Sequence, residues 1–121
     1  RTVCPAGRKE LRVIRKGDVY QIRNRTRDNI PLQWRRYLVL SGEQANRETG
    51  HIVVAPMIPG GAKLFDGNIT RPEVEFQGHL HHVCLDRTRN AEENTLRHGL
   101  GHLPYTEMAK VEASICRIME L

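Results

Sequence analysis

The segment "HIVVAPMI" at residues 51–58 most constrains how this chain can fold, because both of its alternating faces are apolar. A strand of that kind must be covered on both sides, which predicts a central strand or a stave of a barrel. Pro56 cannot donate a hydrogen bond to a neighbouring strand, so it predicts an edge or a bend near the end of the run. The segment "PGGA" at residues 59–62 then breaks the chain.

Shorter strand-like segments lie on both sides of this run. After a turn at Lys16-Gly17, residues 18–24 place Tyr20 and Ile22 on one face, which is typical of a half-buried strand. Residues 81–87 also alternate, with His82, Cys84 and Asp86 on one face. Further strands are predicted at residues 37–40 and 73–76, and residues 41–49 predict a loop or a single helical turn.

The C-terminal end has the periodicity of a helix. Thr106 follows Pro104 and is the predicted N-cap. The apolar stripe is expected to pack on the sheet, with a protein interface as the secondary interpretation; it consists of Met108, Val111, Ile115, Ile118 and Met119. Five or six short strands and one helix predict a mainly β barrel or roll with a C-terminal α-helix. We expect one domain over residues 12–121, preceded by an arm over residues 1–11.

The net charge of +5 is unevenly distributed along the chain. Residues 1–36 hold 11 Lys and Arg against 3 Asp and Glu, whereas residues 37–121 hold 8 against 11. Basic charge concentrated in one third of a chain indicates a surface that faces a polyanion. The alternative is a basic face that only contacts solvent.

Cysteine usage and hydropathy indicate the compartment. Cys4, Cys84 and Cys116 form neither a paired framework nor a CxxC motif, which favours a reducing environment. No apolar run approaches the ~20 residues that span a bilayer. The first ten residues lack the apolar core of a signal peptide, and the absence of an initial Met is compatible with a trimmed start. We therefore expect a cytoplasmic protein.

Three segments share their order and spacing with a known family: "RKGDVYQI", "RRYLVLSGEQANRETGHIVVAPMIPGG" and "GHLPYTEMAKVEASI". Together they resemble the MazF/PemK (Kid-like) toxins of type II toxin–antitoxin systems, over roughly residues 12–121. The resemblance implies an SH3-like β-barrel, shared with CcdB, and a homodimer. It also implies sequence-specific cleavage of single-stranded RNA, often mRNA, without a metal or another cofactor. The implied partner is an antitoxin whose acidic segment occupies the RNA groove.

RNA cleavage without a metal needs a base for the 2′-hydroxyl, a group that stabilises the five-coordinate phosphorus, and an acid for the leaving 5′-oxygen. Arginine suits the second role, because its planar donor fork spreads over phosphate oxygens. The resemblance places the family's catalytic arginine at Arg35, for which the alternative is an arginine that holds a carboxylate or the dimer partner. Arg36 stands where the family usually has Pro, as an additional phosphate-binding or structural residue.

The resemblance also places a catalytic aspartate at Asp86, acting as the base or orienting a guanidinium; the alternative is a strand-end ion pair. His82 shares the predicted face of Asp86 and titrates near neutral pH, so it is a candidate acid or base, or else a hydrogen-bonded surface histidine. Trp34 is expected to stack an unpaired base, to cap the barrel or to line the dimer interface. The other predicted RNA-binding residues are Gln33, Arg15, Lys16, Arg25, Arg27, Gly60, Gly61 and Lys63.

The chain departs from the family at two neighbouring positions. Ile58 stands where the family usually has a catalytic or substrate-contacting Thr, and Pro59 stands where it often has Ser. The loss of both hydroxyls favours an alternative function, a non-catalytic member that binds RNA or a protein target such as gyrase, as CcdB does.

The residues suggest two further chemistries. His79 and His81 share a strand face, which suggests a metal site. Cys84 lies near His82, which suggests a nucleophilic cysteine. Neither pattern has the ligand spacing or the activating motif that such a site needs. We therefore expect no metal site.

Overall fold

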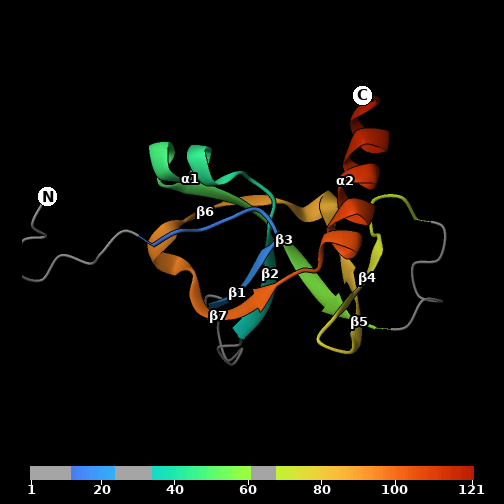
Figure 1. The fold of residues 1–121 in the computed structure, drawn as a ribbon, viewed down its shortest axis with the longest axis horizontal. Coiled ribbons are helices and arrows are strands. Elements are labelled where there is room, and N and C mark those ends of the chain that lie inside the picture. The colour runs from blue at the N-terminus through green and yellow to red at the C-terminus, as the bar shows by residue number, and fades with distance from the viewer. Residues whose placement is uncertain (1–11, 24–33, 61–67) are drawn as a thin grey trace, which may run out of the picture.

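The computed structural model describes residues 12–23, 34–60 and 68–121. Figure 1 shows a curved antiparallel sheet with α2 standing beside β4 and α1 at the far end of β3. The predicted arm over residues 1–11 lies outside the described residues. In chain order the elements are β1 (Asp18–Arg23), β2 (Trp34–Val39), α1 (Glu43–Thr49), β3 (His51–Pro59), β4 (Glu73–Phe76), β5 (His79–Val83), η2 (Leu85–Arg87), β6 (Arg89–Glu92), η3 (Glu93–Thr95), β7 (Arg97–His102) and α2 (Tyr105–Met119).

The seven described strands follow the order β4-β5-β3-β2-β1-β7, with β6 also paired to β3. On one side, β3 pairs with β6 through residues 51–54 and then with β5 through residues 57–59. Pro56 falls between these two stretches, and its carbonyl accepts a hydrogen bond from Cys84 N at 2.9 Å. The N and C=O of one strand residue point the same way. The missing N–H of Pro56 therefore lies where β3 changes its partner from β6 to β5, and it removes no hydrogen bond from either pairing.

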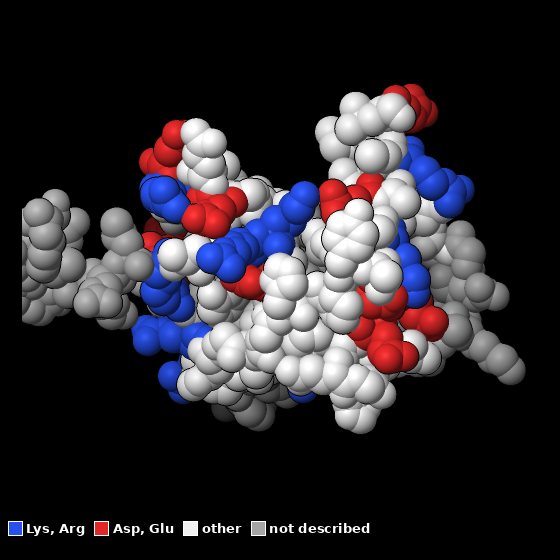
Figure 2. Space-filling model, in the orientation of Figure 1, with Lys and Arg blue, Asp and Glu red and all other residues white. Residues whose placement is uncertain are grey.

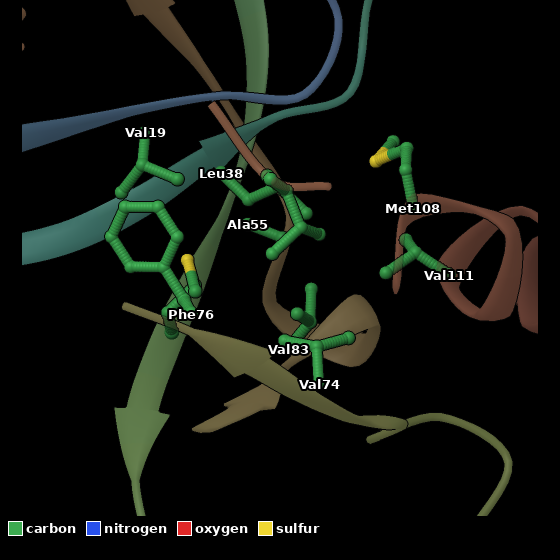
Figure 3. Close-up of a cluster of buried hydrophobic side chains, with 10 residues drawn as sticks. Val19, Leu38, Ala55, Val74, Phe76, Val83, Met108 and Val111 are labelled. Carbon is green, nitrogen blue, oxygen red and sulfur yellow. The ribbon is translucent and has the colours of Figure 1, made fainter. Parts of the chain in front are cut away.

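Both faces of β3 are buried, as its sequence predicted. Ala55 and Met57 belong to a cluster that the strands share with α2, and in Figure 3 Met108 and Val111 point from the helix toward these strands. Ile52 and Val54 belong to a second cluster, whose other buried members are Ile14, Ile22, Tyr37, Val39, Ala91 and Leu96. Apolar side chains on both faces require the sheet to curl around one cluster and to be covered over the other. The predicted mainly β fold with a C-terminal helix is confirmed.

Several predicted boundaries were wrong. β2 begins at Trp34 rather than at residue 37, so both arginines are strand residues. β5 ends at Val83, and Asp86 lies in the 3-10 turn η2 rather than in a strand over residues 81–87. β6 and β7 were not predicted, because their side chains are mostly polar and exposed and therefore lack an apolar alternation.

The helix α2 also corrects two predictions. Pro104, not Thr106, occupies the N-cap position, and no described side chain caps this end. Met108 and Val111 are buried, whereas Ile118 and Met119 are 39% and 63% exposed. The predicted stripe therefore packs on the core at Met108, Val111 and Ile115 and is exposed at Ile118 and Met119. No helix among the described residues is long and apolar enough to cross a membrane.

Candidate nucleic-acid interface

An open groove of about 940 Å³ lies at the Trp34 end of β2. Its walls come from Gln21 of β1, residues 34–36 of β2, residues 56–60 of β3 and residues 78–81 near β5. Four elements from distant parts of the sequence therefore meet at this groove, which is the natural place for a ligand on this fold.

Arg35 and Arg36 both line the groove, although they point to opposite faces of β2. Arg35 pairs across the strands with the buried Ile22 and is itself exposed. Arg36 pairs with Gln21, is half-buried, and brings Nη1 to 2.9 Å from Nε2 of His81. Within the described parts of the chain, neither guanidinium forms a salt bridge with a carboxylate. Two adjacent cations that no described carboxylate neutralises are suited to an anionic ligand.

His81 lines the groove, and the sequence assigned it neither a catalytic nor an RNA-binding role. Its side chain is 1% exposed, and Nδ1 lies 3.1 Å from the carbonyl oxygen of His79. A carbonyl only accepts and a guanidinium only donates. The ring is therefore neutral, with its proton on Nδ1 and the lone pair of Nε2 toward Arg36. Burial lowers the pKa of His81, and the positive charge of Arg36 lowers it further.

His82, the histidine predicted to be catalytic, points to the other face of β5. It pairs with Ile58 across the strands, is 2% exposed, and has Nδ1 3.2 Å from the carbonyl oxygen of Arg71. It does not line the groove. Counting from Val83, which packs in the core, puts His81 on the core side of β5 and His82 on the opposite side with Ile58.

Asp86 is held by Arg71 rather than by either groove arginine. Nε and Nη2 of Arg71 donate to the two carboxylate oxygens at 3.2 Å and 3.1 Å. These hydrogen bonds lower the pKa of Asp86, and the same pairing raises the pKa of Arg71. Asp86 does not line the groove, and a carboxylate with a lowered pKa is a weaker base. Its catalytic role remains a prediction, as does that of His82.

Trp34 is partly packed and partly exposed at the groove, and its stacking on a base stays a prediction. The ring packs edge-on against His98, with the centroids 4.7 Å apart, and Arg23 lies over it at 5.9 Å. The side chain is nevertheless 42% exposed and lines the groove. One part of the indole caps the end of the sheet, and the remainder is accessible to a ligand.

The other predicted RNA-binding residues are divided by the structure. Gly60 lines the groove. Arg15 and Lys16 precede β1 at its opposite end, where Gly17 N donates to Val39 O, roughly 17 Å away for a six-residue strand. Arg15 pairs with Glu43 at 3.4 Å and Lys16 with Glu112 at 3.1 Å. The remaining predictions lie outside the described residues; these are Gln33, Arg25, Arg27, Gly61 and Lys63.

The acidic remainder of the chain thus neutralises part of the basic N-terminal third. On the face shown in Figure 2, Lys and Arg side chains lie directly beside Asp and Glu. The groove end is different, because cross-strand pairing adds Arg97 beside Gln21, an arginine that the sequence did not assign to the site. Nothing in its polar surroundings marked residues 97–102 as a strand, so no pattern placed Arg97 there.

The described residues contain no group of three His, Cys, Asp or Glu side chains that could hold a metal ion. Cys84 is buried, and burial raises the pKa of its thiol. A thiol with a raised pKa is a poor nucleophile, so the structure offers no support for a cysteine-based mechanism.

A comparison with protein-family models decides the family. Residues 15–119 match the model described as "PemK-like, MazF-like toxin of type II toxin-antitoxin system". The chain belongs to the PemK/MazF toxin family. The resemblance noted in the sequence is therefore confirmed. A search of curated proteins found no match.

Solved structures of MazF proteins share the fold. An endoribonuclease in complex with its cognate antitoxin, from a mycobacterial species, has a TM-score of 0.70 at 17% identity and covers 89% of this chain and 96% of its own. MazE-MazF from Deinococcus radiodurans has a TM-score of 0.72 at 18% identity, with coverage of 91% and 98%. The toxin MazF-mt6 from Mycobacterium tuberculosis has a TM-score of 0.65 at 17% identity and covers 86% of this chain and 97% of its own. The predicted barrel with its C-terminal helix is therefore the PemK/MazF type.

Proposed function

We propose that this PemK/MazF-family toxin is an endoribonuclease that cleaves single-stranded RNA at short sequences. The observation that carries the proposal is the groove where Arg35 and Arg36 lie together, without a salt bridge to any described carboxylate. The reaction is attack of the 2′-hydroxyl on the adjacent phosphorus, without a metal ion. It leaves a 2′,3′-cyclic phosphate and a 5′-hydroxyl.

Arg35 is the proposed stabiliser of the five-coordinate phosphorus. Its guanidinium is exposed at the groove, and a planar fork can donate to two phosphate oxygens at once. The exposed part of Trp34 is suited to stacking on a base. Gly60 has no side chain, so the RNA backbone can approach the protein backbone closely at this position.

The proposed partners follow from the family and from the charge of the groove. A type II toxin is paired with an antitoxin, and the mycobacterial endoribonuclease to which this chain is similar is complexed with its own. An acidic, partly disordered antitoxin segment is complementary to the groove arginines. A homodimer in the cytoplasm is proposed from the resemblance.

Arg35→Ala tests the catalytic role. Removing one preorganised donor to a developing oxyanion typically costs about 10²- to 10³-fold in rate, so we expect that loss in cleavage with RNA binding weakened only modestly. The measurement is sequencing of the 5′ ends of RNA cut by pure protein in EDTA, which also reports specificity and end chemistry. Arg47→Ala is the matched control, because Arg47 is paired with Glu43 on α1. This variant should cleave RNA at the normal rate. Intact RNA after incubation with the unmodified protein would overturn the enzymatic proposal.

A second function is favoured by one observation. Ile58 lines the groove, and among its described lining residues none is Ser or Thr. A member without the family's usual hydroxyl is proposed, as the alternative, to bind RNA or a protein such as gyrase without cutting. Gyrase inhibition with RNA left intact would select this alternative.

A further inference from the structure

We propose that His81 is a positioning residue that holds Arg36 in place as a phosphate-binding fork and makes this contact sensitive to pH. The inference rests on the proposed RNA ligand but concerns binding, so it can be tested without cleavage.

The geometry defines what His81 does for Arg36. Nε2 accepts from Nη1 of Arg36 at 2.9 Å, while Nδ1 donates to His79 O at 3.1 Å. The imidazole is therefore anchored on one side and presents a lone pair on the other. This bond uses one nitrogen of the guanidinium, so Nε and Nη2 can donate to two oxygens of a phosphodiester.

Burial makes this arrangement rigid. His81 is 1% exposed and stands edge-on to Phe76, with ring centroids 6.2 Å apart. A long arginine side chain loses much rotamer freedom when it binds a ligand. An arginine already held by His81 has lost part of that freedom beforehand, which favours binding.

The groups that face His81 determine how it titrates. From β2 it meets Arg36, and its own strand contributes His79. From β4 the residues on its side are Val74 and Phe76, and from β3 the partner is Pro59. Glu73 and Glu75 pair with His82 and Leu80 and so point to the other face. No described carboxylate therefore stabilises a protonated His81, whose pKa is lowered by burial and by Arg36.

Protonation of His81 replaces the acceptor with a donor. Nε2–H and the guanidinium then repel each other, so Arg36 must leave its position. We expect this transition below pH 6.5, the ordinary value for histidine, since the shift is downward.

The first experiment reads the tautomer directly. A long-range ¹H–¹⁵N spectrum of the protein at pH 7.5 should show His81 neutral with its proton on Nδ1. A proton on Nε2, or a charged ring at this pH, would overturn the proposal regardless of any activity.

The second experiment compares two substitutions in binding to a 2′-O-methyl RNA pool, which cannot be cut by 2′-hydroxyl attack. His81→Leu removes the acceptor and should weaken binding about tenfold at pH 7.5. His81→Gln provides an amide oxygen that does not titrate, so it should restore binding. Other histidines also gain charge in acid. The readout is therefore the dissociation constant of the unmodified protein divided by that of the His81→Gln variant. This ratio should rise below pH 6.5.

Two controls complete the design. In an Arg36→Ala background both His81 substitutions should have no effect on binding, and His79→Gln, at an exposed groove histidine, should leave the acid transition in place. Equal pH profiles for the unmodified protein and His81→Gln would overturn the proposal. If the His81→Leu variant does not fold, the tautomer of His81 and the pH profile of the His81→Gln variant still test the proposal. RNA binding with the expected profile but without cleavage would reject the proposed enzyme and retain this inference.

Discussion

The ion pair of Arg71 and Asp86 is a single-residue feature with a clear pH signature. The Arg71 side chain is 12% exposed and that of Asp86 40% exposed, so solvent screens the pair in part. The pKa of Asp86 is lowered from 3.8 by the hydrogen bonds from Arg71. A carboxyl group with a lowered pKa stabilises the folded state above its unfolded pKa, and this stability is lost as the pH falls through the folded value.

We therefore expect Asp86→Asn to lower the free energy of unfolding by about 1 kcal/mol at pH 7. The difference from the unmodified protein should begin to shrink below about pH 4, where the carboxyl group of the unfolded chain becomes protonated, and should be lost below the lowered folded pKa. Urea titrations at pH 7 and pH 3.5 measure both values. Glu120→Gln at the end of α2 serves as control, and a difference that persists unchanged at pH 3.5 would contradict the ion-pair explanation.

At the scale of single residues, the sequence placed some of the side chains that meet at the groove and missed others. Arg35, Arg36, Trp34 and Gly60 were placed together from the sequence, and the structure brings them to one groove. The sequence placed His82 on the face of the strand opposite Val83, as the structure does, and its catalytic role stays a prediction. The sequence assigned His81 no RNA-binding role, because its contact with Arg36 joins residues 45 positions apart and leaves no local pattern.

Among the elements, α2 offers a comparison between two identical side chains in different environments. Met108 is 5% exposed and packs in the core cluster, whereas Met119 is 63% exposed. Truncation of a buried Met leaves a cavity and typically costs about 2–5 kcal/mol. We expect Met108→Ala to lower the free energy of unfolding by that amount and Met119→Ala to change it by less than about 0.5 kcal/mol. Urea unfolding followed by circular dichroism tests both, and a large loss for Met119→Ala would show that its surface is buried in an assembly.

The elements also show what an apolar pattern can and cannot predict. β3 was predicted as a central strand or a barrel stave, because its composition requires burial on both faces. β7 has only one partly buried side chain and is held by backbone pairing to β1. Backbone pairing depends on neighbours that are distant in sequence, so a polar strand of this kind leaves no local signal.

For the whole molecule, the salt dependence of RNA binding distinguishes the two ends of β1 and β2. Binding to a single strand weakens with salt by a slope of roughly 0.7 for each phosphate that the protein neutralises. Replacing Arg35 and Arg36 by Gln should therefore reduce the slope by about 0.7 for each phosphate that is no longer neutralised. The same change at Arg15 and Lys16, which are paired with carboxylates, should leave the slope nearly unchanged. Equal effects of the two double variants on 2′-O-methyl RNA would show that RNA covers both ends.

Internal pairing of basic side chains has a further consequence for how partners arrive. Carboxylates neutralise Arg15 and Lys16, whereas no described carboxylate pairs with Arg35 or Arg36. Within the described fold, the positive potential therefore increases along β1 and β2 toward the groove end. Fields of this kind turn a charged partner during diffusion and raise the rate of productive encounter. A nucleic acid and an acidic protein segment would be guided to the same end. Under the proposed function, competition between RNA and antitoxin would begin with the rate of capture, before either has formed a contact in the groove.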